Sequence, residues 1–242
     1  VKDALALLDQ RGIKPAAFIV DTIISSGGVI ATPPGYLKEV ARIVREAGAL
    51  FIADEVQPGF GRTGHTFWGY EVDDFIPDIV TMGKPMGNGH PLAATVTRRD
   101  LVDAFSKRTH YFNTFGGNPV SCAAGLAVLD VIEQEGLQQN ALEVGLYINA
   151  CLAELATRHE SIGDVRGDGL FKAVELVTDR DSRAPATALA GRVVEELRQR
   201  RVLAGRIGMA NNVLKLRPPM VFSKENADYF VSILDDVLAD LT

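Results

Sequence analysis

Two short, uninterrupted apolar runs flank an amphipathic segment near the start of the chain, and this arrangement restricts the fold most strongly. Residues 17–20 and 49–53 are apolar throughout, and each run is followed by an aspartate, Asp21 or Asp54. Between them, apolar residues recur at three- and four-residue steps over residues 37–47. That spacing is typical of one helix face. A strand, a helix and a strand of these lengths predict a βαβ unit, whose parallel strands are covered on both faces.

The pattern changes after the first half of the chain. Two further strands are predicted at residues 79–82 and 93–96, with a loop between them. The later patterns predict helices over residues 119–134, 138–158, 186–200 and 224–241, and strands over residues 170–177 and 213–217. This second part is typical of a smaller α+β unit, so we expect a boundary near residues 136–160.

The charge and composition of the chain limit its partners. There are 25 Lys and Arg against 31 Asp and Glu, a net charge of −6, whereas a nucleic-acid binder needs a basic face. No apolar run reaches the roughly 20 residues that span a bilayer, so neither nucleic acid nor a membrane is expected as a partner. Two cysteines, Cys122 and Cys151, cannot form a disulfide framework and fit a reducing, cytoplasmic compartment. The four histidines lack metal-ligand spacing, so no metal site is expected.

Two candidate functional residues follow predicted strands, which is where open α/β sheets bind ligands. Asp54 could hold a cationic ring nitrogen, because a carboxylate in a site of low dielectric constant favours a charged partner; it could also be an ordinary loop acid or helix cap. Lys84 lies in a glycine-rich loop with Gly83, Gly87 and Gly89. An ammonium partly buried among small residues can become a nucleophilic amine that forms a Schiff base. The alternative is a surface lysine.

Two more candidates lie further along the chain. Residues 111–119 combine the Thr114 hydroxyl, two adjacent glycines and the start of a predicted helix, which suits a phosphate; an ordinary turn before a helix has the same pattern. Arg217 ends a predicted strand and offers a rigid fork to a carboxylate, although a surface ion pair would look the same. No dinucleotide-binding, zinc-hydrolase or α/β-hydrolase motif is present in the sequence, so those classes have no support.

Five motifs follow one another in an order and spacing that cover almost the whole chain. They are FIADEVQ (51–57), GFGRTG (59–64), PDIVTMGK (77–84), NTFGGNP (113–119) and VRGDGL (165–170). Together they resemble the class III (ornithine/4-aminobutyrate-type) pyridoxal-phosphate aminotransferases of fold type I.

The resemblance implies a division of the chain into two domains. Residues 1–136 would be the C-terminal part of the large, mostly parallel α/β/α domain that binds the cofactor. Residues 137–242 would be the small C-terminal α+β domain. The family's N-terminal part supplies a phosphate cup and an aromatic that stacks on the cofactor ring, and neither is in this sequence. We therefore expect the chain to be a C-terminal portion.

The resemblance also implies cofactor roles. Lys84 would form the internal aldimine with pyridoxal 5'-phosphate and act as the general base that moves the Cα proton. Asp54 would pair with the pyridine nitrogen and keep it protonated, so that the ring can accept electrons. Val56 would pack on one ring face, and Gln57 would hydrogen-bond the ring's phenolic oxygen.

Partner and substrate roles follow in the same way. Thr114 would bind the phosphate of the cofactor in the neighbouring subunit, which implies a homodimer, and Arg217 matches the arginine that binds the substrate carboxylate. The implied activity moves an amino group from an amino acid or amine to a keto acid. The chain has Asp21-Thr22 where family members usually carry Glu-Pro, and this departure affects the choice of amino donor.

An alternative activity comes from a subgroup of the same family. Residues 82–91 and 218–220 look closest to the ethanolamine-phosphate and phosphohydroxylysine phospho-lyases. A phospho-lyase acting on an O-phosphorylated amino alcohol or amino acid is therefore the second hypothesis, although Arg217 favours transamination because a lysine often stands there in the subgroup. An inactive truncated fragment is the third.

Overall fold

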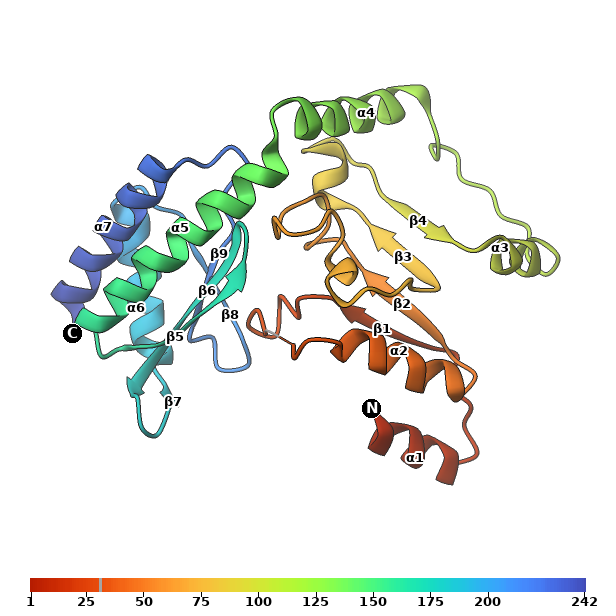
Figure 1. Ribbon diagram of the computed structural model, residues 1–242, viewed down its shortest axis with the longest axis horizontal. Coiled ribbons are helices and arrows are strands. Elements are labelled where there is room, and N and C mark those ends of the chain that lie inside the picture. Colours follow the sequence, from red (N-terminus) through yellow and green to blue (C-terminus); the bar gives the residue numbers. More distant parts are fainter. Residues whose placement is uncertain (31) are drawn as a thin grey trace. The chain divides into compact units, whose positions relative to one another are not determined.

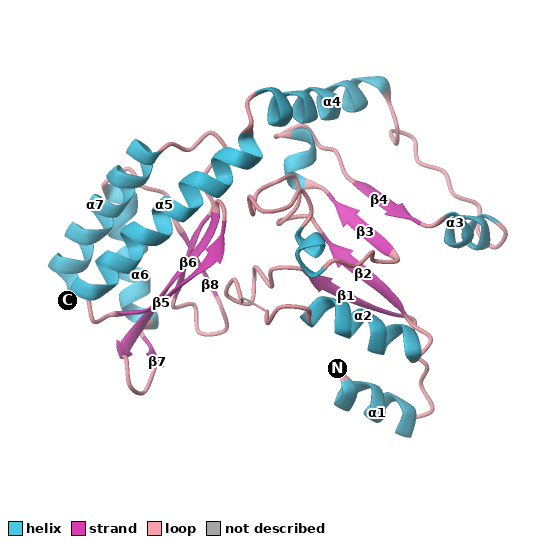
Figure 2. Cartoon of the chain, in the orientation of Figure 1, coloured by secondary structure: helices cyan, strands magenta, loops and turns pink. Residues whose placement is uncertain are grey.

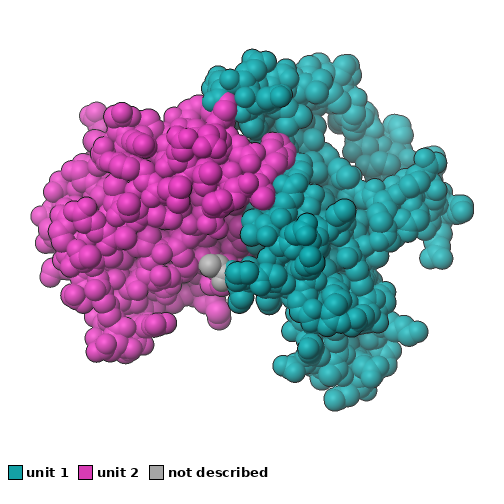
Figure 3. Space-filling view, viewed as in Figure 1, with its two compact units in different colours: residues 1–22, 32–60, 68–135 teal, residues 23–31, 61–67, 136–242 magenta. Residues whose placement is uncertain are grey.

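The computed structural model describes residues 1–30 and 32–242 of the chain (Figure 1). They cluster into two units (Figure 3). Unit 1 comprises residues 1–22, 32–60 and 68–135, and unit 2 comprises residues 23–31, 61–67 and 136–242. Two short segments from the first half of the chain, residues 23–31 and 61–67, thus belong to unit 2. The two domains expected over residues 1–136 and 137–242 stay a prediction, because a cluster of contacts does not by itself define a domain of the whole protein.

Unit 1 is organised around a four-stranded sheet with the order β1-β2-β3-β4. The strands are β1 (Ala17–Asp21), β2 (Leu50–Asp54), β3 (Ile79–Met82) and β4 (Ala94–Thr97). The helices are α1 (Lys2–Gln10), α2 (Tyr36–Glu46), α3 (Arg99–Ser106) and α4 (Pro119–Gln134), with short 3-10 helices η1 (Gly69–Asp73) and η2 (Lys84–Gly87). β1, β2 and β3 are parallel and β4 is antiparallel to β3. The prediction of an α/β fold with a mostly parallel sheet is confirmed.

Helix α2 is the crossover between β1 and β2, and its apolar stripe forms the core of unit 1. Leu37 and Val44 of α2 are buried against Phe51 and Ala53 of β2. Phe51 and Ala53 lie on one face of the sheet, because side chains alternate along a strand. Ile19 of β1 lies on the opposite face and is 60% exposed. Within unit 1, α2 therefore covers one face of the sheet as predicted, whereas Ile19 on the opposite face is exposed.

Unit 2 has an antiparallel sheet with the order β5-β6-β9-β8, and a short β7 pairs with β6 (Figure 2). The strands are β5 (Ile162–Asp168), β6 (Phe171–Asp179), β7 (Ala184–Pro185), β8 (Gly205–Ile207) and β9 (Val213–Leu216). The helices are α5 (Leu137–Arg158), α6 (Thr187–Gln199) and α7 (Lys224–Leu241). Val174 and Leu176 of β6 share a core with these helices, whereas Phe171 and Ala173 pack with Val29 on the other face. In the described part of the chain, no helix is long and apolar enough to cross a bilayer.

Candidate active site

The carboxyl ends of β2 and β3 place two predicted residues on neighbouring strands of unit 1. Asp54 is the last residue of β2 and pairs in register with Thr81 of β3. Lys84 follows the end of β3 after one intervening residue, Gly83. Since β2 and β3 are parallel, both residues lie at the sheet edge where α/β proteins bind ligands. The Asp54 side chain is half-buried and Lys84 is exposed.

The backbone around Asp54 is fixed by two hydrogen bonds. Asp54 Oδ1 accepts a hydrogen bond from the N–H of Val56 at 3.0 Å, a turn closed by the aspartate's own side chain. The N–H of Glu55 donates to the carbonyl of Thr81 at 2.8 Å, which extends the β2–β3 ladder by one residue. Among the residues that the structure describes, Asp54 Oδ2 has no hydrogen-bond partner, so one carboxylate oxygen is available to a ligand.

Lys84 has an unusual backbone conformation. Its φ is +28°, a left-handed value that is costly for a residue with a side chain. It opens the 3-10 helix η2, where the N–H of Met86 donates to the Gly83 carbonyl at 2.9 Å. The Lys84 amine makes no hydrogen bond or ion pair with the described residues. Backbone strain of this kind clusters at functional sites.

Val56 and Gln57 lie in the segment that follows Asp54, and Val56 reaches the backbone beside Lys84. A Cβ placed on Gly83 would lie 3.7 Å from Val56 Cγ1, so the isopropyl group is in van der Waals range of the residue before the lysine. Gln57 is half-buried. Asp54, Val56 and Lys84 are thus brought together, with Gln57 next to them in the chain.

The loop after Lys84 is anchored on α4. His90 Nε2 lies 2.7 Å from Ser121 Oγ, which also accepts a hydrogen bond from Asn118 Nδ2 at 2.9 Å. A Cβ on Gly125 of α4 would lie 2.7 Å from Leu92 Cδ2. These contacts attach the loop that follows Lys84 to α4. Sequence reasoning assigned no role to His90, Leu92, Ser121 or Gly125.

Glu55 is a buried carboxyl group that sequence reasoning also missed. Its side chain is inaccessible to solvent and accepts three hydrogen bonds, from Thr22 Oγ1 at 3.0 Å, Gly69 N at 2.8 Å and Tyr70 N at 2.9 Å. Burial raises the pKa of Glu55 to about 7, against the lowering effect of these hydrogen bonds. Thr22 stands where family members usually carry the proline of Glu-Pro. Its hydroxyl donates a hydrogen bond to Glu55, and a proline side chain has no group that could donate one.

Thr114 lies in an exposed turn before α4. Asn113 Oδ1 accepts hydrogen bonds from the N–H groups of Phe115 and Gly116 at 3.1 and 2.9 Å. Asn118 then caps the helix by accepting from Ser121 N at 3.0 Å. The turn itself therefore uses the N–H groups of Phe115 and Gly116, although Thr114 is exposed.

Arg217 belongs to unit 2, where it follows β9 and is exposed. A second guanidinium lies near it: burial, and then the positive charge of Arg217, lower the pKa of Arg62 to about 10. Arg62 Nη1 donates to the carbonyls of Leu170 at 3.2 Å and Pro218 at 2.8 Å. Unit 2 therefore has two neighbouring cations at this strand end. In the described residues, no group of three or more His, Cys, Asp or Glu could hold a metal ion.

Comparison with known proteins identifies the family. The model of the class-III aminotransferases matches residues 3–238, and the chain belongs to this family. It is 50% identical over 220 residues to alanine–glyoxylate aminotransferase 2 homolog 2, mitochondrial, of Arabidopsis thaliana, covering 91% of this chain and 46% of that protein. It is 43% identical over 241 residues to ethanolamine-phosphate phospho-lyase homolog 1 of Caenorhabditis elegans, covering 98% and 52%. The chain spans about half the length of these relatives.

Solved structures give the same result for the fold. A phospholyase from Arthrobacter, in complex with phosphoethanolamine, matches 100% of this chain and 57% of its own with a TM-score of 0.96 and 47% identity. An amine transaminase from an uncultivated Pseudomonas species, in its PLP-bound form, matches 100% and 55% with a TM-score of 0.89 and 35% identity. The predicted fold class and the resemblance to both branches of the family are confirmed.

Proposed function

We propose that the protein is a pyridoxal-phosphate-dependent aminotransferase that moves an amino group from an amino acid or amine to a keto acid. The observation that carries this proposal is the placement of Asp54 and Lys84 at neighbouring strand ends, with Val56 beside the lysine's backbone. Membership of the class-III family over residues 3–238 supports it.

The side chains of unit 1 fit this cofactor. The Lys84 amine would hold it covalently, and the open Oδ2 of Asp54 would face the ring nitrogen. Val56 would lie against one ring face and the Gln57 amide would donate to the ring's phenolic oxygen. When bound, the cofactor supplies a protonated ring that draws electrons from the substrate's Cα.

The residues of the chain would then perform two tasks. Asp54, as an anion, would keep the ring nitrogen protonated, because an opposite charge nearby favours the charged form. Lys84 Nζ would take up the proton from the substrate's Cα and later release it, acting first as a general base and then as a general acid. In unit 2, the Arg217 guanidinium would bind the substrate's carboxylate through paired hydrogen bonds.

Thr114 would bind the phosphate of the cofactor held by the neighbouring subunit of a homodimer. The surface around it supports this part of the proposal, since Phe112 is 77% and Phe115 is 78% exposed. The following helix α4 exposes Val120 and Leu126 at 69% and 62%. Apolar side chains gathered at a surface in this way mark protein interfaces.

A phospho-lyase is the second candidate function. The match to the Arthrobacter phospholyase favours it, as does the pair of cations, Arg62 and Arg217, which would suit a phosphate as well as a carboxylate. In this reaction Lys84 would remove the same proton, but phosphate would leave the substrate instead of nitrogen being transferred.

One experiment separates the two functions. The full-length protein is given either alanine with glyoxylate or phosphoethanolamine alone, and glycine, inorganic phosphate and aldehyde are measured. Glycine formation that requires the keto acid supports an aminotransferase. Phosphate release without a keto acid contradicts it and supports the phospho-lyase. The Lys84→Ala variant is the control and should abolish either product.

The third hypothesis, an inactive fragment, is tested on the 242-residue chain. Pyridoxal phosphate is added, and the absorbance of a borohydride-reducible adduct is recorded. A band that disappears in the Lys84→Ala variant excludes a fragment that is inactive because it cannot hold the cofactor. The absence of any band in a folded chain supports it.

We place the protein in the cytoplasm, a proposal supported by the free thiols of Cys122 and Cys151. The names of two relatives assign them to mitochondria. Cell fractionation with an antibody against the protein tests the compartment, and recovery with mitochondria would contradict our assignment.

A further inference from the structure

Two strands close the loop of residues 83–93 at both ends, since Met82 of β3 pairs in register with Ala94 of β4. Inside the loop, three overlapping backbone hydrogen bonds of 2.9, 3.1 and 2.9 Å each span three residues and run from the Gly83 carbonyl to the N–H of His90. A continuous series of turns therefore links the lysine's end of the loop to the histidine.

His90 ties this loop to α4. Its Nε2 lies 2.7 Å from the Oγ of Ser121, a buried residue of the helix. Among the residues that the structure describes, this is the one side-chain hydrogen bond between residues 83–93 and another element. Asn118 holds the serine from the other side, because its Nδ2 donates to Ser121 Oγ at 2.9 Å and its Oδ1 accepts from Ser121 N at 3.0 Å. The serine hydroxyl is thus fixed at the start of the helix.

The tie matters because Lys84 needs support to keep its backbone conformation. Its φ of +28° is a left-handed value that a side chain disfavours, and such residues persist only where the surrounding structure over-determines them. The lysine is exposed, and its amine makes no hydrogen bond or ion pair with the described residues, so its own side chain does not give that support. The support comes from the turns of the loop, which are attached to β3 at one end and through His90 to α4 at the other.

We propose that His90 is a positioning residue for Lys84. Its hydrogen bond to Ser121 keeps residues 83–93 on α4 and thereby keeps the lysine backbone in the conformation from which the amine takes up the cofactor. This inference rests on the proposed function, in which Lys84 holds pyridoxal phosphate. Without the tie, the lysine visits ordinary backbone conformations, and the apparent affinity for the cofactor falls with the fraction of molecules that stay competent.

Four variants separate the tie from other effects. His90→Leu and Ser121→Ala each remove one partner, and Ser121→Ala keeps the backbone N–H that Asn118 caps. His90→Gln places an amide near the position of Nε2, and because an amide can donate or accept, it should restore the tie. Ser106→Ala is the matched control, since this exposed serine donates to the Asp103 carbonyl within its own helix at 3.1 Å.

The first measurement is hydrogen–deuterium exchange of the full-length protein without cofactor, read by mass spectrometry on a peptide that covers residues 85–92. Loss of the tie should speed exchange of this peptide by about two- to ten-fold, the factor that corresponds to one net hydrogen bond. We expect this in His90→Leu and Ser121→Ala, and wild-type exchange in His90→Gln and Ser106→Ala. Unchanged exchange in the first two variants would overturn the proposal, since the loop would then not depend on the tie.

The second measurement is a titration of the same folded proteins with pyridoxal phosphate, in which the dissociation constant of the borohydride-reducible adduct is determined. The constant should rise by a similar factor in His90→Leu and Ser121→Ala and return to the wild-type value in His90→Gln. A merely structural hydrogen bond would lower the stability of the variants without changing the affinity of the molecules that are folded. Unchanged affinity would therefore show that His90 does not position the lysine.

The outcomes distinguish this inference from the proposed function. If the wild type forms no adduct at Lys84, the proposed function fails and the positioning role fails with it. If the adduct forms with an affinity that the tie does not influence, only the positioning role fails. The double variant His90→Leu/Ser121→Ala should bind the cofactor no more weakly than either single variant, because both remove the same contact, and an additive loss would contradict the proposal. If His90→Leu does not fold, Ser121→Ala still decides.

Discussion

Glu55 fixes the end of β2 through its three hydrogen bonds, so its replacement should be costly. In Glu55→Gln, one carboxylate oxygen becomes an NH₂ group that faces a donor, since Oε1 accepts from Thr22 and Tyr70 and Oε2 accepts from Gly69. An unsatisfied buried donor costs about 1–3 kcal/mol. We expect the free energy of unfolding in urea to fall by this amount. Glu46→Gln, at an exposed ion pair with Arg42, should change it by less than about 0.5 kcal/mol.

The raised pKa of Glu55 also predicts how stability depends on pH. The folded chain binds this proton up to about pH 7, whereas the unfolded chain releases it near the ordinary value of 4.5. The contribution of Glu55 to stability is therefore fully present below pH 4.5 and is lost as pH rises through about 7. Glu55→Gln does not titrate in this range. As pH rises from about 5 to about 8, the free energy of unfolding of the wild type should therefore fall relative to that of the variant. A difference that stays constant over this range would contradict the raised pKa of Glu55.

At the scale of single residues, the sequence could predict positions but not environments. Asp54 and Lys84 follow apolar strands, and strand ends of parallel sheets meet at one edge, so their proximity could be expected. Glu55 is adjacent to Asp54 and has the same charge, yet it is buried because successive side chains on an extended backbone point to opposite sides. Its three hydrogen bonds come from Thr22, Gly69 and Tyr70, which no local pattern connects to it.

At the scale of elements, the contact between α5 and the β5–β6 hairpin depends on Gly145. A Cβ at this position would lie 2.3 Å from the Gly169 carbonyl oxygen and 2.6 Å from Gly169 Cα, and backbone atoms cannot move aside cheaply. Gly145→Ala should lower the free energy of unfolding by about 1–3 kcal/mol, the usual cost of overpacking, as measured by urea titration with circular dichroism.

Gly125 of α4 is the control for that variant. Its added Cβ would meet the end of the flexible Leu92 side chain at 2.7 Å, and alanine is favoured over glycine inside a helix by about 0.5–1 kcal/mol. Gly125→Ala should therefore be close to neutral. If both variants lose the same stability, helix propensity or the unfolded state dominates and the α5 contact is not the cause.

Elements with strong local signals were predictable, and those without them were not. The helices predicted over residues 119–134 and 224–241 have the same bounds in the structure, where Asn118 and Ser223 cap them. Strand β5 (Ile162–Asp168) has a largely polar, half-exposed sequence, and β8 has only three residues. Neither contains an apolar run, since their pairing partners β6 and β9 supply most of the buried surface.

At the scale of the whole molecule, the proposed homodimer predicts an effect of charge on α4. Leu126→Arg places a cation on the exposed apolar face of this helix, and desolvating an unpaired charge at an interface is costly. We expect the full-length variant to sediment as a monomer at concentrations where the wild type is a dimer. Ile76→Arg, at another exposed apolar residue of unit 1 (80% exposed), should leave the dimer intact. A dimeric Leu126→Arg variant would show that α4 lies outside the interface.

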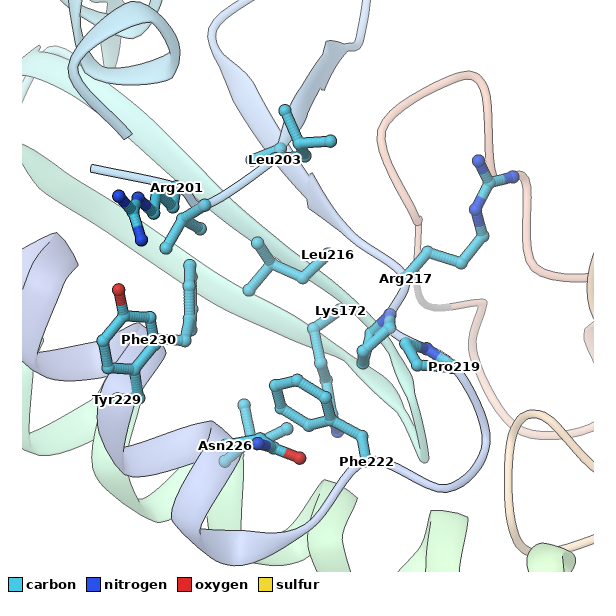
Figure 4. Close-up of a pocket in the computed structure, with 14 residues that line it drawn as sticks. Lys172, Arg201, Leu203, Leu216, Arg217, Pro219, Phe222, Asn226, Tyr229 and Phe230 are labelled. Carbon is cyan, nitrogen blue, oxygen red and sulfur yellow. The ribbon is translucent and has the colours of Figure 1, made fainter. Parts of the chain in front are cut away.

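The family and the mostly parallel sheet of unit 1 could be read from the sequence, whereas the burial of Lys172 in unit 2 could not. Lys172 falls within a predicted strand, and strand alternation alone does not say whether a lysine there meets solvent or a core. Lys172 is buried and pairs in register with Leu216 of β9, which lies more than forty positions away in the chain (Figure 4). The assignment of residues 23–31 and 61–67 to unit 2 is likewise a result of long-range packing that no local pattern encodes.

The left-handed backbone of Lys84 has a consequence for protein engineering. A side chain held at this φ costs of the order of 1–3 kcal/mol, and glycine would relieve that strain. Random mutagenesis followed by selection for heat resistance would therefore enrich substitutions that remove the amine itself. Directed evolution of this protein should combine every thermal screen with a screen for turnover, since resistance and catalysis make opposite demands on this one position.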